Sequence, residues 1–137
     1  EYYKGYSDWK KKASRINCLN LITNFVDPVS IFEKSDILIL PSFREGFGNI
    51  VIEAQAAGLC IISSDVYGLK DSFVDKSSGY QCKAGNAKCF IDKVLKLHLD
   101  KKLMKEMQLN AVNFSKKFHE DFFRKDLKVV YNLIGVI

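Results

Sequence analysis

A run of four apolar residues at 37–40, Ile-Leu-Ile-Leu, constrains the fold most, because a loop containing two glycines and then a helical pattern follow it directly. A short apolar run bounded by turn residues predicts a buried strand. The next helix is expected to begin near Gly48 or Asn49. Gly46 and Gly48 permit backbone conformations closed to other residues. Since the N-terminus of a helix favours an anion, this strand, loop and helix start predict a site for a nucleotide phosphate.

Two carboxylates frame the predicted phosphate loop. Glu45 directly precedes Gly46, and Glu53 lies about one and a half turns into the helix. Carboxylates only accept hydrogen bonds, which suits the hydroxyls of a sugar and a ribose better than a phosphate. Glu45 and Glu53 could therefore hold different parts of one elongated polar ligand. The spacing alone leaves a second interpretation open, in which a common E-G-F-G turn precedes a helix with a solvent-exposed glutamate.

The segment at 35–58, S-D-I-L-I-L-P-S-F-R-E-G-F-G-N-I-V-I-E-A-Q-A-A-G, resembles the signature of the retaining glycosyltransferases of family 4. The likeness extends over about residues 20–113 and includes the two glutamates separated by seven residues. It implies a GT-B enzyme, in which two Rossmann-like domains close around a nucleoside-diphosphate sugar. We expect residues 1–137 to form a single α/β domain, a Rossmann-like parallel sheet flanked by helices. By this resemblance it is the donor-binding, C-terminal domain portion, truncated at its N-terminus and without the acceptor domain.

The resemblance also implies roles for individual residues. Glu45 is expected near the hydroxyls of the donor sugar, as the catalytic residue of this chain, and Glu53 on the ribose hydroxyls. The nucleobase is expected near the loop at 24–27. The Arg and Lys that neutralise the diphosphate in the family cannot be assigned in this sequence. The donor-binding backbone amides are expected at Gly46, Phe47, Gly48 and Asn49.

Two departures from the family pattern leave the donor sugar open. Cys60 stands where the family usually has proline. At 67–71 the chain reads Y-G-L-K-D, where the family commonly has G-G-x-P-E. Gly68 in this run has two interpretations, a close approach of the backbone to the ligand or an ordinary turn glycine.

The implied reaction is transfer of a sugar, with retention, from a nucleoside-diphosphate donor to an acceptor hydroxyl by a hexosyltransferase of cell-surface polysaccharide or glycolipid synthesis. A UDP-sugar is the expected donor, and this fragment alone is expected to be inactive. No metal or other cofactor is expected, because the sequence has no Asp-x-Asp triplet and no His/Cys cluster. Two alternatives stay open. One is a nucleotide-sugar epimerase of related two-domain architecture, which needs an acid/base pair near the sugar, and the other is a non-catalytic nucleotide-sugar binding module.

Charge and composition limit the partners. The net charge is +5, but the lysine clusters fall in helix-like segments that also carry acids, which indicates solvated helical faces. The basic clusters are not interleaved with aromatic residues, so no nucleic acid is expected. The expected partners are the sugar donor, a sugar or lipid-linked acceptor and the missing N-terminal domain. No apolar stretch approaches the ~20 residues of a membrane span. We expect a cytoplasmic protein, with peripheral contact to an anionic membrane surface left open.

The four cysteines contain no C-x-x-C pair and are expected to be reduced thiols. Alternating strand and helix patterns favour a parallel sheet. Further strands are predicted at 20–26, 59–64 and 79–82, and helices at 7–16, 29–35 and 86–99, the last capped by Asn86, with another helix through 103–111. His98 and His119 are expected at the surface. The apolar residues at 118–134 are expected to form a terminal helix.

Overall fold

A parallel sheet organises the chain. The computed structural model describes residues 11–13, 15–20, 22, 24 and 26–119. Within these residues, three parallel strands lie in the order β1 (Ile37–Leu40), β2 (Cys60–Ser64) and β3 (Gly79–Cys82). All three match predicted strands, and β2, fully buried along its length, is the central one.

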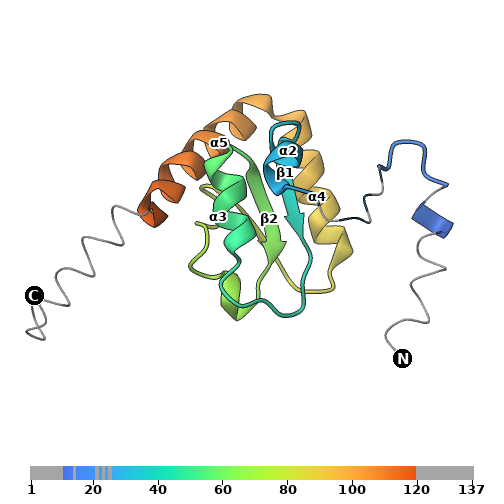
Figure 1. Cartoon of the computed structure of the whole chain (residues 1–137), viewed down its shortest axis with the longest axis horizontal. Coiled ribbons are helices and arrows are strands. Elements are labelled where there is room, and N and C mark those ends of the chain that lie inside the picture. Colours follow the sequence, from blue (N-terminus) through green and yellow to red (C-terminus); the bar gives the residue numbers. More distant parts are fainter. Residues whose placement is uncertain (1–10, 14, 21, 23, 25, 120–137) are drawn as a thin grey trace, which may run out of the picture.

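Helices cover both faces of the sheet (Figure 1). On one face lie α2 (Pro28–Phe32) and α3 (Asn49–Ala56), and on the other α4 (Ala87–Leu99). Next, α5 (Lys101–Ser115) runs from α4 past the N-terminal end of the sheet to α3. Two 3₁₀ turns, η1 (Tyr67–Leu69) and η2 (Lys116–Phe118), follow β2 and α5. The predicted layered α/β fold is therefore observed.

Side-chain alternation along β2 divides the core in two. Cys60 and Ile62 face α4 and α5, in a cluster that includes Leu97 and Met107. Ile61 faces the other side and packs with a cluster that includes Val51 of α3. Strands of a parallel sheet that is covered on both faces are often near-continuous apolar runs, and β1 has this pattern. We refer to these two sides as the α4 face and the α3 face.

The helices of the α4 face begin at side-chain caps. Asn86 Oδ1 accepts a hydrogen bond from Cys89 N at 3.1 Å, so the predicted cap of α4 is confirmed. At the start of α5, Asp100 Oδ1 accepts from Leu103 N at 2.9 Å. Such caps satisfy N–H groups that would otherwise lack a partner in the first turn.

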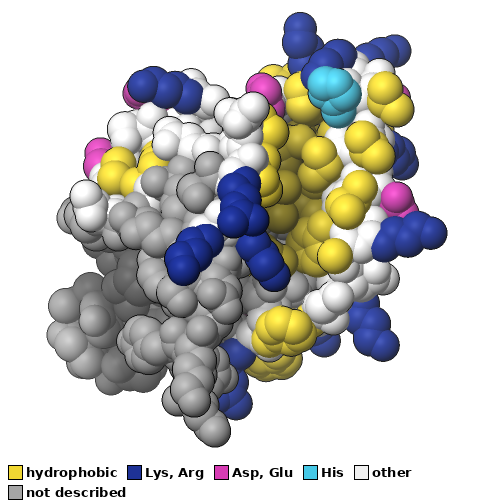
Figure 2. Space-filling model, turned by 90° about the vertical axis from the view of Figure 1, so that its right-hand side faces the viewer, with side chains coloured by type: hydrophobic (Ala, Val, Ile, Leu, Met, Phe, Trp, Pro, Cys, Tyr) yellow, Lys and Arg dark blue, Asp and Glu magenta, His cyan; other side chains and the backbone are white. Residues whose placement is uncertain are grey.

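The outer side of α4 is apolar as well as its inner side. Figure 2 shows hydrophobic side chains gathered on the side of the molecule that carries this helix. On α4 the exposed large hydrophobic residues are Ile91, Leu95 and Leu99. His98 lies exposed beside them, as predicted, and His119 is also exposed. No helix among the described residues is both long enough and apolar enough to cross a bilayer.

The prediction of four reduced cysteines is wrong for two of them. Cys82 and Cys89 form a disulfide, with their Cα atoms 5.8 Å apart. The short loop from the end of β3 to the first turn of α4 brings the two residues within the ~4.4–6.8 Å that a disulfide requires. A C-x-x-C search could not reveal this pair, because the fold brings the residues together across a strand-to-helix turn. Cys18 and Cys60 are free thiols, exposed and buried respectively.

Three predicted elements lie partly outside the described residues. Of the predicted helix at 7–16, residues 11–13 are helical, whereas Arg15 and Ile16 are described and are not helical. Of the predicted strand at 20–26, Asn20, Ile22, Asn24 and Val26 are described, and none of them is in a strand. The predicted terminal helix at 118–134 lies outside the described residues beyond His119.

Candidate functional site

The loop between β1 and α3, residues 41–48, contains Gly46 and Gly48, and we call it the glycine loop. It lies at the C-terminal edge of the sheet, where open α/β sheets bind their ligands. The helix begins at the N-cap Gly48, which has left-handed backbone angles of φ 71° and ψ 47°. Within the part of the chain that the structure describes, no side chain caps α3. The first N–H groups of this helix are therefore not satisfied by its own N-cap side chain and can bind an anion.

Gly48 is required by the fold for two reasons. Its positive φ falls in the region that favours glycine. A Cβ at this position would also collide with Leu69 Cδ2, because Gly48 is buried against that side chain. The start of α3 is thus fixed by the packing of the loop that follows β2.

Gly46 differs from Gly48 in both respects. It is exposed, its φ is not in the left-handed region, and a Cβ added to it would have no neighbour within 4 Å. The packing of the described residues does not require glycine here. The absence of a side chain instead leaves the backbone of Gly46 open to a close approach from outside.

Gly68 lies in a turn and also makes a close backbone contact within the chain. It lies in η1, and a Cβ added to it would overlap the carbonyl oxygens of Glu45 and Gly46. The close backbone approach therefore exists, but it is made to the glycine loop of the same chain. This contact could not be predicted from local patterns, because the two segments are more than 20 residues apart.

Glu45 is half-buried and held by a neighbour that sequence reasoning missed. Ser42 Oγ donates a hydrogen bond to Glu45 Oε1 at 2.5 Å. This bond orients the carboxylate within its loop and leaves Oε2 for other partners. The sequence feature that could have indicated this hydrogen bond is a serine three residues before a glutamate in a turn.

Glu53 lies exposed on α3 between two hollows. The smaller has a volume of about 280 Å³ and is lined by Phe47, Asn49, Ile52, Glu53 and Phe118. The larger, of about 600 Å³, lies between α2 and α3 and is lined by Asp27, Pro28, Val29, Phe32, Glu53, Ala56 and Ala57. The structure thus brings together three of the sequence-predicted residues, Phe47, Asn49 and Glu53. Glu45 is not among the residues that line either hollow.

Phe118 is a further residue of the site that the sequence did not indicate. Its ring centroid lies 5.7 Å from that of Phe47 and 5.6 Å from that of Phe114, both in tilted arrangements. Such aromatic pairs stabilise a contact beyond the area they bury. They attach the end of α5 to the glycine loop.

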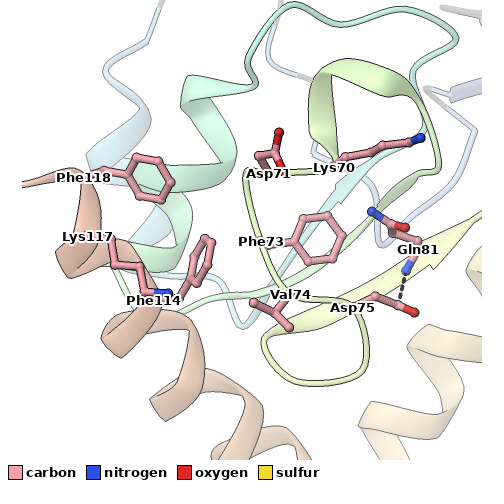
Figure 3. Close-up of a pocket in the computed structure, with 9 residues that line it drawn as sticks. All are labelled: Lys70, Asp71, Phe73, Val74, Asp75, Gln81, Phe114, Lys117 and Phe118. Carbon is pink, nitrogen blue, oxygen red and sulfur yellow. Dashed lines mark hydrogen bonds between the residues drawn. The ribbon is translucent and has the colours of Figure 1, made fainter.

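A third hollow, of about 590 Å³, lies on the other side of Phe118 (Figure 3). Phe73 forms its floor, and Asp75 Oδ1 accepts a hydrogen bond from Gln81 N at 2.8 Å at one end. Lys70 and Lys117 also line it, so its walls carry both signs of charge. It is separate from the two hollows that share Glu53.

The titratable and metal-ligating groups add little to the site. Burial, followed by the negative charge of Asp36, raises the pKa of the Cys60 thiol to about 11. Cys60 lies at the start of β2, and the glycine loop follows the end of β1, so this thiol lies at the other edge of the sheet. Among the described residues, no three His, Cys, Asp or Glu side chains converge in an arrangement that could hold a metal ion.

Comparison with known proteins yields a family match and several relatives. The model of the family described as glycosyl transferases group 1 matches residues 8–114. The chain is 32% identical over 113 residues to the capsular polysaccharide biosynthesis glycosyltransferase CapM of Staphylococcus aureus, covering 82% of the chain and 30% of that protein. It is 31% identical over 108 residues to the N,N'-diacetylbacillosaminyl-diphospho-undecaprenol alpha-1,3-N-acetylgalactosaminyltransferase of Campylobacter jejuni, covering 79% and 29%. The chain therefore spans about a third of the length of these curated relatives.

Solved structures agree on the fold. Anabaena Alr3699/HepE, solved in complex with UDP, matches with a TM-score of 0.80 at 14% identity, covering 95% of this chain and 36% of that one. At such an identity the likeness concerns the fold alone. This likeness confirms the predicted fold class, which is the GT-B type of parallel sheet flanked by helices.

Proposed function

Because the chain belongs to the glycosyl transferases group 1 family, we propose that it is the donor-binding part of a retaining glycosyltransferase. In this proposal the enzyme transfers a sugar from a nucleoside-diphosphate sugar, a UDP-sugar, to an acceptor hydroxyl. One observation carries it. The glycine loop combines an uncapped helix start at Gly48 with an open backbone at Gly46, next to a hollow lined by Glu53.

The diphosphate is assigned to the start of α3. The N–H groups there and the positive end of the helix dipole favour a negative charge, and departure of the diphosphate increases that charge in the transition state. Donors that are already fixed in place stabilise such a charge without rearranging. The left-handed Gly48, fixed against Leu69, supports this role because it holds the helix start in one position.

Glu53 is assigned to the ribose. It lies between a hollow beside the helix start and a larger one that reaches Asp27, where the nucleobase is proposed to bind. A ribose joins a base to a diphosphate, so a hydroxyl-binding carboxylate between two such hollows fits a nucleotide. The UDP bound to the structurally similar Anabaena protein supports uracil as the base.

Glu45 is assigned to the hydroxyls of the donor sugar. The hydrogen bond from Ser42 holds one oxygen of its carboxylate, so that the other can accept from the sugar. A carboxylate held in one orientation loses less freedom on binding. This arrangement would align the sugar for attack from the face that the diphosphate leaves, giving retention.

The acceptor is proposed to be a sugar or a lipid-linked sugar of a cell-surface polysaccharide or glycolipid. The two curated relatives support this, since one is named for capsular polysaccharide synthesis and the other for a diphospho-undecaprenol substrate. In this proposal the reaction takes place at the cytoplasmic face of a membrane, in keeping with a lipid-linked acceptor. An acceptor domain outside the present chain would complete the enzyme, in keeping with the share of the relatives that the chain spans.

Calorimetric titration of the full-length protein with UDP, GDP and ADP tests this proposal. We expect UDP to bind, and Glu53→Ala to weaken this binding by about 1–3 kcal/mol, which is roughly fivefold to 150-fold in Kd. Glu106→Ala, which removes an exposed glutamate from α5, is the matched control and should leave the Kd unchanged. Equal affinity of UDP for the protein with and without Glu53 would remove this residue from the site.

A further inference from the structure

The segment at 66–72 packs against the back of the glycine loop. Gly68 faces the backbone of Glu45 and Gly46 so closely that a Cβ has no room. Leu69, which is 0% exposed, places its Cδ2 where a side chain on Gly48 would stand. The loop that precedes α3 therefore rests on a second loop, which we call the supporting turn.

One side chain of α3 holds the supporting turn. Gln55 is 0% exposed, and its Nε2 donates hydrogen bonds to Ser72 O at 2.6 Å and to Val51 O at 3.2 Å. Ser72 is also 0% exposed, and its Oγ donates to Leu69 O at 2.9 Å. A continuous chain of hydrogen bonds thus joins the helix that begins at Gly48 to the turn that fixes Gly48.

Gln55 is an unfavourable residue to bury unless its amide is needed. It belongs to the motif at 35–58 yet lies inside the apolar α3 face, where its Oε1 is buried and has no hydrogen-bond partner among the described residues. Burying a polar atom without a partner costs stability, and an unbranched apolar side chain would avoid that cost. The two bonds from Nε2 are the interactions that only this side chain makes, and one of them crosses to the supporting turn.

We propose that Gln55 is a positioning residue of the donor site, one that sets the glycine loop through the supporting turn without touching the ligand. Loss of the bond to Ser72 O frees the turn, and with it the contacts of Gly68 and Leu69 that shape the loop. The helix start and the backbone of Gly46 then no longer hold one arrangement. The inference rests on the proposed function, since it assigns the loop to the diphosphate and the sugar.

Two buried substitutions in the full-length protein test the proposal. Gln55→Met removes both Nε2 bonds and keeps an unbranched side chain of similar size. Ile62→Val is the control, because it removes a methylene from a fully buried position on the α4 face. We expect Gln55→Met to raise the Kd for UDP about tenfold or more and Ile62→Val to change it less than twofold. Unchanged UDP affinity in Gln55→Met overturns the proposal.

Amide hydrogen exchange without ligand separates this inference from the proposed function. The hydrogen bonds from Leu69 N to Val66 O and from Val51 N to Gly48 O report on the supporting turn and on the helix start. We expect both amides to exchange at least tenfold faster in Gln55→Met, and the amide of Leu97 in α4 to keep its rate. If the wild-type protein binds no nucleotide, the function fails while this result still upholds the positioning role. Unchanged exchange at Val51 overturns the positioning role in either case.

If Gln55→Met does not fold, Gln55→Glu provides a second test of the positioning role. A protonated glutamate can donate one hydrogen bond to Ser72 O, whereas the carboxylate faces a carbonyl oxygen with no proton to offer. Burial moves a glutamate pKa above its ordinary value of about 4.3. The ratio of the variant's Kd for UDP to the wild-type Kd should therefore rise with pH above that value. A ratio that does not change with pH overturns the proposal.

Discussion

The two faces of the sheet are built by different means. On the α4 face, Asn86 and Asp100 cap their helices and the buried side chains form an apolar cluster. On the α3 face, the helix begins at an uncapped glycine, and Gln55 and Ser72 are buried among the apolar residues. The α4 face thus has the capped helices and apolar core that favour stability. On the α3 face, α3 has no side-chain cap among the described residues, and polar side chains are buried around the glycine loop. Such departures from what favours stability are expected where a protein binds its ligand.

The largest change in stability should come from the α4 face. Leu97 is 0% exposed in its core cluster, so Leu97→Ala should lower the free energy of unfolding by about 2–5 kcal/mol. Chemical denaturation measures this loss. If the α4 face only stabilises the fold, the UDP affinity of the folded variant stays within twofold of wild type. A large loss of affinity would show that the α4 face also supports the donor site.

The two glycines of the glycine loop provide a matched pair of substitutions on the α3 face. Gly48→Ala should destabilise by about 1–3 kcal/mol, because it places a Cβ against Leu69 and requires a left-handed alanine. Gly46→Ala meets no neighbour and should leave stability within about 0.5 kcal/mol. Both should weaken UDP binding. Denaturation and titration of the pair would refute the assignment of Gly46 if its alanine variant binds UDP normally.

A smaller loss should follow removal of the α4 cap. Asn86→Ala deletes the acceptor of the Cys89 N–H and should cost about 1 kcal/mol. Thermal unfolding of the variant measures the loss. Asn113→Ala, in the last turn of α5, is the control and should cost less, because it removes only the exposed hydrogen bond that Asn113 Oδ1 accepts from Lys116 Nζ at 3.0 Å. If Asn86→Ala is as stable as wild type, the side-chain cap does not stabilise α4.

The smallest effect concerns thiol chemistry. An ordinary thiol is half ionised near its reference pKa of 9.0, whereas burial and Asp36 raise the pKa of Cys60 to about 11. Because the folded state holds the neutral thiol, this group's contribution to stability is present below pH 9 and is lost as the pH rises toward 11. Iodoacetamide at pH 9 should therefore label Cys18 well before Cys60. Equal labelling rates would contradict the burial of Cys60 in the native protein.

The sequence predicted the elements better than it predicted their contacts. The three strands of the sheet, the Asn86 cap and the start of α3 follow from local patterns and were found where expected, whereas the described residues of the predicted strand at 20–26 are not in a strand. The disulfide between Cys82 and Cys89 was missed because it depends on the path of the chain between β3 and α4.

The candidate site shows the same division. Glu53, Phe47 and Asn49 share a hollow because one helix start carries all three. The contacts of Gly68, Gln55 and Phe118 with this region could not be predicted, because they join segments that only the tertiary fold brings together. A motif therefore identifies candidate ligand-binding residues when they lie on one local element. The residues that support them come from other segments of the chain.

The assignment of the donor to the glycine loop is tested by following the amide chemical shifts of the isotope-labelled full-length protein during a UDP titration. We expect the amides of Gly46, Phe47, Gly48, Asn49 and Glu53 to shift together and to saturate at one Kd, while those of α4 stay in place. Shifts confined to other parts of the protein, or none at all in the folded protein, would contradict the assignment of the donor site to the glycine loop.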